Sequence, residues 1–139
     1  MNRLVLGALM SLTLVSSALA DDTFSFTPNT AAFPFKWHVV INGTTAADNP
    51  TLHVIRGQTY NFIVNGNLSH PFYVKTVDGN GTANGYSGFS PNGVSTSTMQ
   101  TVAFTVPDDA PDSLFYNCAI HTSMSGPIDV SIFRDGFGD

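Results

Sequence analysis

The sequence predicts an all-β protein with a Greek-key β-sandwich, and three observations support this prediction. Val, Ile, Thr, Phe and Tyr gather in short segments, and Gly, Pro, Asn and Asp separate these segments. Beyond residue 20, no stretch repeats its apolar residues with the 3.6-residue period of a helix. Many short strands joined by frequent turns within a chain of this length are typical of a sandwich.

The segments expected to form strands are, in chain order, 23–26, 36–41, 51–55, 59–65, 72–77, 99–106, 114–117 and 128–133. Two of them alternate clearly between apolar and polar residues. Tyr60, Phe62 and Val64 share one face of the fourth segment, and Val102 and Phe104 share one face of the sixth. Strict alternation indicates a strand with one buried face, so we expect these residues in the core. Met99 is also expected there.

The connecting segments are short, with one exception. Residues 56–58 predict a tight turn, and residues 107–112, bounded by proline, predict a turn that leads into the seventh strand. Residues 78–97 are rich in Gly, Asn, Ser and Thr, so we expect a long loop with room for one short strand. Residues 134–139 are expected to form a frayed tail.

The first twenty residues have the pattern of a cleavable signal peptide. Arg3 precedes an apolar run from residue 4 to residue 15, and Ala18-Leu19-Ala20 fits a signal peptidase site. A retained membrane anchor is the alternative, but the apolar run is too short to span a bilayer comfortably. We therefore expect an exported protein, periplasmic or secreted, with residues 1–20 as signal and residues 21–139 as a single domain.

The charge of the expected mature domain restricts its partners. It contains ten aspartates, no glutamate and only four basic residues, which are Lys36, Arg56, Lys75 and Arg134. An acidic surface with so few Lys and Arg argues against binding to nucleic acid or to anionic membranes. A basic or neutral protein partner remains compatible with it.

Cys118 is the single cysteine of the chain. Exported domains of this size often carry paired cysteines, and an unpaired thiol is reactive in an oxidising compartment. Metal ligation would both use and protect this thiol. A buried, inert cysteine is the simpler alternative.

A segment near the C-terminus favours metal ligation by Cys118 over a buried, inert cysteine. In Leu114-Phe115-Tyr116-Asn117-Cys118-Ala119-Ile120-His121-Thr122-Ser123-Met124-Ser125-Gly126, the residues Cys118, His121 and Met124 follow one another at intervals of three. A thiolate, imidazoles and a thioether are the ligand set of a copper ion that cycles between Cu(I) and Cu(II). The alternative for His121 is a surface imidazole, and that for Met124 is a core residue that fills space.

Such a site needs a second imidazole from elsewhere in the fold. His70 follows a polar, glycine-containing loop at the start of an expected strand, and loops at one end of a sandwich cluster in space. The alternative for His70 is a turn histidine bonded to the main chain. His38 and His53 lie within expected strands, and we interpret both as structural or surface residues.

These residues together resemble the cupredoxins, the family of plastocyanin, azurin, pseudoazurin and amicyanin. The resemblance covers the whole mature domain, and it includes the early His70, the V-x-F-x-V-P strand that ends at Pro107 and the L-F-Y-x-C-x-x-H-x-x-M-x-G segment. It implies one type 1 copper ion bound by His70, Cys118, His121 and Met124, with Met124 as the axial ligand. The chain departs from many relatives at Pro71, where they have asparagine, because proline has no main-chain N–H to donate.

The resemblance implies a small blue-copper protein that carries single electrons, not an enzyme. Its partner would be a transiently bound redox protein, and nothing in the sequence predicts a strong dimer interface. His121 would then present its ring edge to solvent, with Ile120 in a docking patch. Two alternatives remain open at this point: a copper delivery or storage protein, and a cupredoxin-like interaction module with little or no metal.

Overall fold

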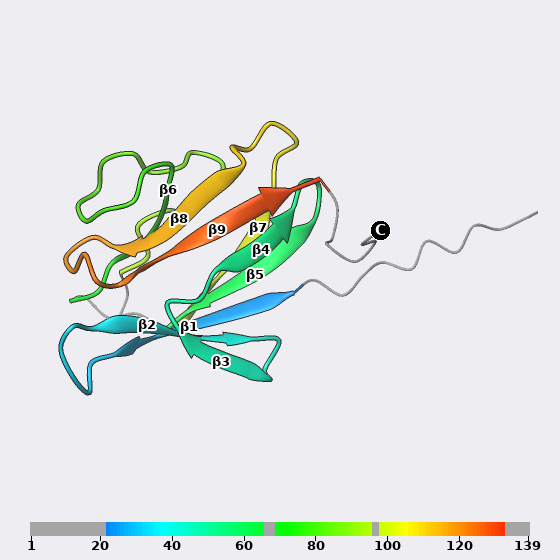
Figure 1. The fold of residues 1–139 in the computed structure, drawn as a ribbon. Coiled ribbons are helices and arrows are strands. Elements are labelled where there is room, and N and C mark those ends of the chain that lie inside the picture. Colours follow the sequence, from blue (N-terminus) through cyan, green and yellow to red (C-terminus); the bar gives the residue numbers. More distant parts are fainter. Residues whose placement is uncertain (1–21, 66–68, 96–97, 133–139) are drawn as a thin grey trace, which may run out of the picture.

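The computed structural model describes residues 22–65, 69–95 and 98–132, and within them the chain forms nine β-strands (Figure 1). The strands are β1 (Thr23–Asn29), β2 (Lys36–Ile41), β3 (Thr45–Asp48), β4 (Leu52–Ile55), β5 (Thr59–Val64), β6 (Phe72–Lys75), β7 (Gln100–Thr105), β8 (Ser113–Cys118) and β9 (Ser125–Ser131). The expected signal peptide and the expected C-terminal tail lie outside the described residues.

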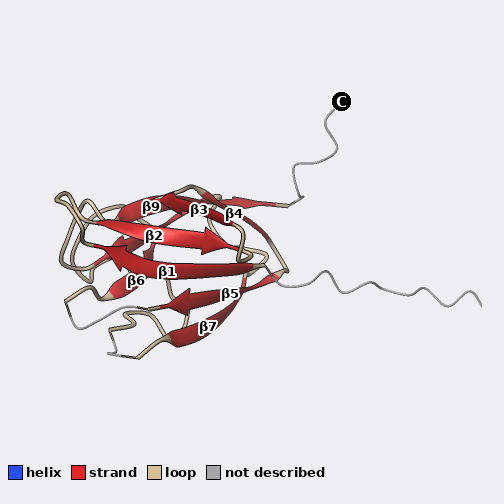
Figure 2. Cartoon of the chain, turned by 90° about the horizontal axis from the view of Figure 1, so that it is seen from below, coloured by secondary structure: helices blue, strands red, loops and turns tan. Residues whose placement is uncertain are grey.

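The strands form two sheets that pack face to face (Figure 1), and Figure 2 looks from below onto the five-stranded sheet. One sheet has five strands in the order β3-β2-β1-β5-β7, and the other has four in the order β4-β9-β8-β6. β1 runs parallel to β5 and β4 runs parallel to β9, whereas the other neighbours are antiparallel. The all-β sandwich expected from the sequence is confirmed.

Aromatic rings from both sheets fill the space between them. The ring of Phe26 in β1 lies 5.5 Å from that of Phe62 in the same sheet, 4.7 Å from that of Phe72 and 5.2 Å from that of Tyr116 in the opposite sheet, measured between centroids. The residues expected on the buried faces of β5 and β7 are all buried. Burying rings of this size supplies much of the stability of a small sandwich.

Two expectations about the strands were wrong. β3 was not predicted, because its residues Thr45–Asp48 are all exposed and include two alanines and an aspartate, which have low strand propensity. Its strand conformation comes from pairing with β2. Met99, expected in the core, is 66% exposed because β7 begins one residue later, at Gln100.

The long loop after β6 contains no named strand among its described residues, and it covers the free edge of the four-stranded sheet. Its main chain bonds to β6 at Val74 and at Phe72, through Tyr86 N to Val74 O (2.9 Å) and Phe72 N to Val94 O (2.8 Å). Phe89 and Val94 of this loop are buried in the core. The loop therefore satisfies the hydrogen-bonding groups that an edge strand leaves unpaired.

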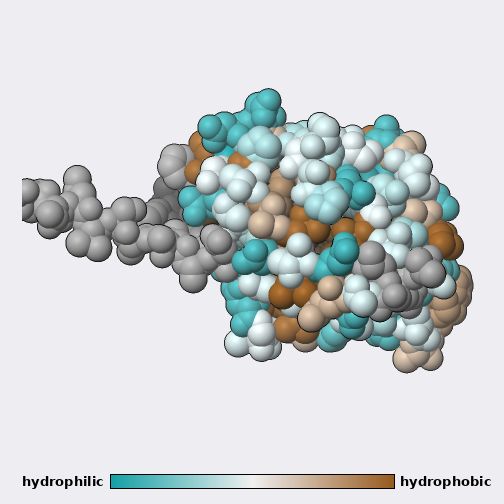
Figure 3. Space-filling view, turned by 180° about the vertical axis from the view of Figure 1, so that it is seen from behind, coloured by the Kyte–Doolittle hydropathy of each residue, from teal (hydrophilic) through white to brown (hydrophobic). Residues whose placement is uncertain are grey.

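The surface is mixed in character. On the face drawn in Figure 3, apolar side chains form small patches that polar side chains separate. No helix among the described residues has the length and apolar character needed to cross a bilayer.

Candidate metal centre

Cys118 and His70 meet at one end of the sandwich because of the pairing between β6 and β8. Cys118 is the last residue of β8, and it lies opposite Phe72, the first residue of β6. His70 lies two residues before Phe72, so the strand register carries it to the thiol across 48 positions of sequence. The expectation that these two segments come together is confirmed.

His121 completes a compact group with these two residues. The Sγ atom of Cys118 lies 3.9 Å from Nδ1 of His70 and 3.7 Å from Nδ1 of His121, and the two imidazole rings lie 4.8 Å apart between centroids. One donor atom from each residue falls within 4.8 Å of the others. Cys118 and His70 are buried, whereas His121 is half-buried, so the group reaches solvent on the side of His121.

Met124 ends the loop that begins after Cys118. The main-chain N–H of Cys118 donates to the carbonyl oxygen of Met124 (2.8 Å), and the N–H of Met124 donates to the carbonyl oxygen of His121 (3.1 Å). The side chain of Met124 is fully buried. These two main-chain bonds close a tight segment from Cys118 to Met124, which includes all three of the regularly spaced residues.

The surroundings of the group favour a neutral imidazole at His70 and place a hydrogen-bond donor against the sulfur of Cys118. Burial, and after it the positive charge that His121 can carry, hold the pKa of His70 below its usual value. The N–H of Ile120 lies 3.4 Å from the sulfur of Cys118 and points toward it. A neutral imidazole is the form that binds metal.

Pro71 links the two ligand segments in a way the sequence did not predict. Although it has no N–H, its carbonyl oxygen accepts the N–H of Ala119 at 2.9 Å. The loop before β6 and the loop after β8 are therefore joined directly beside His70 and Cys118.

Two residues from the loops of the other sheet, Phe35 and Asn49, contact this end, and no motif pointed to them. The ring of Phe35 approaches His121 at 5.3 Å and His70 at 6.1 Å between centroids, edge to face in both cases. Its carbonyl oxygen accepts the hydroxyl of Ser123 at 2.8 Å, and the side-chain amide of Asn49 donates to the carbonyl oxygen of Ser123 at 2.7 Å. Phe35 thus forms a wall over both imidazoles, held against the ligand loop.

The donor set fits copper better than the other common metals. Two imidazoles, one thiolate and one thioether are the soft and borderline ligands of type 1 copper sites, and the described donor group includes no carboxylate, the ligand that calcium and magnesium prefer.

The remaining histidines lie apart from this group. His38 pairs with Asp48 (Nδ1 to Oδ1, 3.0 Å) between β2 and β3, and His53 lies 3.6 Å from Asp129 between β4 and β9. Both side chains are exposed, which agrees with the interpretation of them as structural or surface residues.

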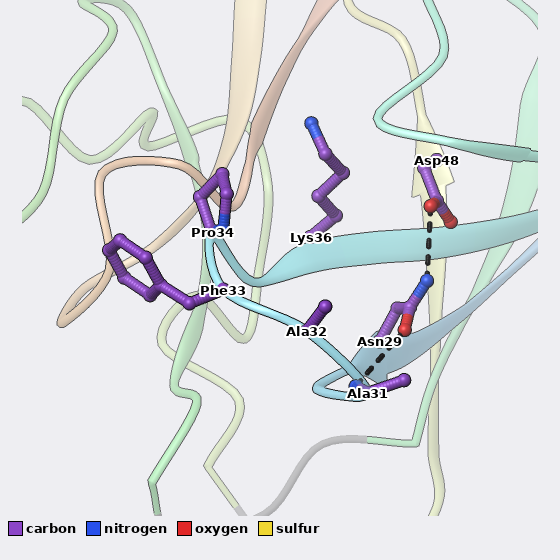
Figure 4. A pocket seen from close by; sticks show the side chains of 7 residues that line it. All are labelled: Asn29, Ala31, Ala32, Phe33, Pro34, Lys36 and Asp48. Atoms are coloured by element: carbon purple, nitrogen blue, oxygen red, sulfur yellow. Dashed lines mark hydrogen bonds between the residues drawn. The ribbon is translucent and has the colours of Figure 1, made fainter.

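A separate pocket of about 250 Å³ lies beside the connection between β1 and β2 (Figure 4). On the polar side of the pocket, the side-chain amide of Asn29 donates to Asp48 at 3.0 Å. The Oδ1 atom of Asn29 accepts the N–H of Ala31 at 3.3 Å. Phe33 forms part of its apolar side, and the ring of Phe33 packs on Phe35 at 5.8 Å. The pocket therefore borders the wall over the imidazoles but is not part of the donor group.

Comparison with known proteins gives structural similarity without sequence similarity. No protein-family model matches the sequence, and no curated protein matches it. A methionine-to-glutamine mutant of rusticyanin is similar in structure, with a TM-score of 0.50 and 17% identity, over 78% of this chain and 76% of that one. Rusticyanin from Thiobacillus ferrooxidans gives a TM-score of 0.49 and 22% identity, over 78% and 75% of the two chains.

Lac15 from a marine microbial metagenome is also similar, with a TM-score of 0.40 and 14% identity, over 80% of this chain and 31% of that one. At these identities the likeness concerns the fold, which the two sheets and their strand order support independently. The chain has the cupredoxin fold, and one end of its sandwich brings together the histidines and the cysteine of a His-Cys-His-Met set that resembles a type 1 copper site.

Proposed function

We propose that this protein is an exported one-electron carrier that binds a single copper ion through His70, Cys118, His121 and Met124. The observation that supports it most strongly is the convergence of three donor atoms, from segments 48 residues apart, within 4.8 Å of one another. A mutant of rusticyanin has a similar structure, and rusticyanin is described as a copper protein. Copper, when bound, would supply a one-electron couple between Cu(I) and Cu(II).

Electron transfer fits this donor set better than catalysis. Catalytic metal sites usually keep one coordination position open for water or substrate, whereas two imidazoles, a thiolate and a thioether leave none. The tight loop from Cys118 to Met124 and the link from Pro71 to Ala119 restrain the ligands on both sides. Restrained ligands need little rearrangement when the charge of the site changes.

The partner would dock around His121. This half-buried imidazole is the member of the group nearest solvent, and Ile120 beside it is 52% exposed. Phe33, which packs on Phe35, is 81% exposed. Small apolar contact surfaces of this kind suit short-lived redox complexes, so we propose a transiently bound redox protein as partner and a monomeric carrier.

Export rests on the sequence alone, through the signal-like pattern of residues 1–20. Its direct test is N-terminal sequencing of the protein recovered from the periplasm or medium of an expressing cell. A mature protein that begins at Asp21 is the expected result, and a protein retained in the membrane with Met1 intact would contradict it.

The copper site is tested with the purified mature domain. Addition of Cu(II) should give intense visible thiolate-to-copper absorption with one copper per chain, and cyclic voltammetry should show a reversible one-electron wave. Cys118→Ser should abolish the colour, whereas His53→Ala, which changes a histidine distant from the group, should not. Copper-loaded protein without this absorption would contradict the proposal, and tight Cu(I) binding without reversible voltammetry would favour metal delivery instead.

A further inference from the structure

The base of the ligand loop carries a polar cluster on the face of β8 opposite to the core. Asn117 directly precedes Cys118, Ser125 directly follows Met124, and these two residues pair across the hairpin of β8 and β9. Asp78, from the long loop after β6, lies against both. The side-chain amide of Asn117 donates to Oδ1 of Asp78 at 2.7 Å, and the hydroxyl of Ser125 donates to the same oxygen.

The amide of Asn117 depends on this carboxylate for its orientation. Asn117 is 1% exposed, and its Nδ2 also donates to the hydroxyl oxygen of Ser125 at 2.9 Å. Its Oδ1 is buried and has no hydrogen-bond partner within the part of the chain that the structure describes. A carboxylate can only accept, so the nitrogen of the amide must face Asp78, and the orphaned oxygen is the consequence.

The segment that carries Asp78 is itself anchored from two sides. The buried ammonium group of Lys75 donates to the carbonyl oxygens of Gly79 (2.7 Å), Asn80 (3.1 Å) and Gly81 (3.3 Å). The N–H of Gly81 donates to the carbonyl oxygen of Ala119 at 2.7 Å. Asn117 before the ligand loop, Ser125 after it and Ala119 inside it are therefore all hydrogen-bonded to the short segment 78–81.

We infer that Asp78 is a positioning residue for the metal-binding loop, holding Asn117 and Ser125 together so that Cys118 and Met124 keep their separation. Charge-assisted hydrogen bonds to a carboxylate are about twice as strong as neutral ones, and two of them here converge on a single oxygen. Pro71, directly before β6, can accept a hydrogen bond from the loop but cannot donate one, and this cluster restrains the loop from its other face. The inference deepens the proposed copper site and rests on it.

The first test uses the metal-free mature domain and needs no copper. Hydrogen exchange measured by NMR should show the amides of Cys118 and Ala119 exchanging at least about tenfold faster in Asp78→Ala, as expected for the loss of the two charge-assisted hydrogen bonds. The amide of Phe62, in the opposite sheet, should keep its protection. The matched control is Asp109→Ala, which removes an exposed carboxylate from the loop that leads into β8 at its other end.

Asp78→Asn keeps an oxygen that accepts the same two bonds, so it should restore most of the protection of Cys118 and Ala119. Ser125→Ala removes one donor and serves as the milder variant if Asp78→Ala fails to fold; it should accelerate exchange at the same two amides by a smaller factor. Unchanged exchange in the variant that folds, or an acceleration equal to that in Asp109→Ala, would overturn the inference.

The second test uses copper-loaded protein and separates this inference from the proposed function. If wild-type protein shows the thiolate-to-copper absorption, Asp78→Ala should shift the position or relative intensity of its bands, whereas Asp109→Ala should not. An Asp78→Ala spectrum and reduction potential identical to those of wild type would overturn the positioning role and leave the copper site standing. If wild-type protein binds no copper, the proposed function fails, and the exchange experiment still decides whether Asp78 restrains the loop.

Discussion

Asn49 joins the ligand loop to the opposite sheet: its side-chain amide donates to the carbonyl oxygen of Ser123, 74 residues away, at 2.7 Å. The same side chain accepts the N–H of Trp37 at 2.8 Å, and the N–H of Asn49 donates to the carbonyl oxygen of Trp37 at 2.8 Å. Asn49 has a positive φ of 49°, a conformation that asparagine tolerates better than most residues. A single residue therefore connects β2, the turn before β4 and the loop that carries His121 and Met124.

Asn49→Ala should lower the free energy of unfolding by about 2–3 kcal/mol, because it removes two partly buried hydrogen bonds and leaves a β-carbon in the left-handed region. Asn49→Gly should cost less, since glycine adopts this φ without strain while losing the same two bonds. Urea denaturation of the metal-free domain measures both. Equal stability of the two variants would show that the backbone conformation contributes nothing.

Phe35→Ala should retain the copper colour but lower the reduction potential by tens of millivolts, on the order of the 59 mV that corresponds to a tenfold change for one electron. The ring faces both imidazoles, and its removal admits water, which stabilises the more highly charged oxidised site. Phe33→Ala, which removes an exposed ring one step further out, is the matched control. An equal shift of the reduction potential in both variants would show that the ring of Phe35 does not exclude water from the copper site.

Gly126→Ala should destabilise the domain by about 1–3 kcal/mol through overpacking. A β-carbon at position 126 would overlap the hydroxyl oxygen of Tyr116, which is buried and donates to the carbonyl oxygen of Pro50 at 2.5 Å. A tyrosine hydroxyl is protonated at neutral pH and can donate, and burial raises the pKa of Tyr116 further. Gly85→Ala is the control, because its β-carbon would meet no atom closer than 3.4 Å; thermal unfolding compares the two.

The stability of the metal-free domain should fall in acid more steeply for wild type than for Asp78→Asn. Partial burial acts to raise the pKa of Asp78, but the hydrogen bonds from Ser125, Asn117 and Gly79 and the charge of Lys75 outweigh it, and the pKa is lowered. A carboxyl whose pKa is lower in the folded state contributes stability above its unfolded pKa, and this contribution is lost as the pH falls through the folded pKa.

Urea midpoints measured between neutral pH and about pH 3, just below the ordinary aspartate pKa of about 3.9, test this expectation. The difference between wild type and Asp78→Asn should be largest at neutral pH and should shrink at the acidic end. Two curves that remain parallel over the whole range would show that the carboxylate of Asp78 is not linked to folding.

Much of the fold follows from local pattern. The alternation in Thr59–Val64 and Gln100–Thr105 predicts which side chains are buried, because successive residues of a strand point to opposite faces. β3 could not be predicted in this way, since an exposed edge strand has no buried face to leave a pattern and depends on its partner β2. Met99 was misplaced for a related reason: a strand boundary depends on pairing, and its pairing starts only at Gln100.

Three of the four candidate ligands follow from the sequence alone, because Cys118, His121 and Met124 share a single short segment and their spacing is a local property. Only the tertiary structure brought His70 to the thiol, through the register of β6 against β8. Phe35, Asn49 and Asp78 reach the same loop across 88, 74 and 39 positions of sequence. Such contacts are set by how two sheets and a long loop pack together, and no local pattern of apolar and polar residues encodes that packing.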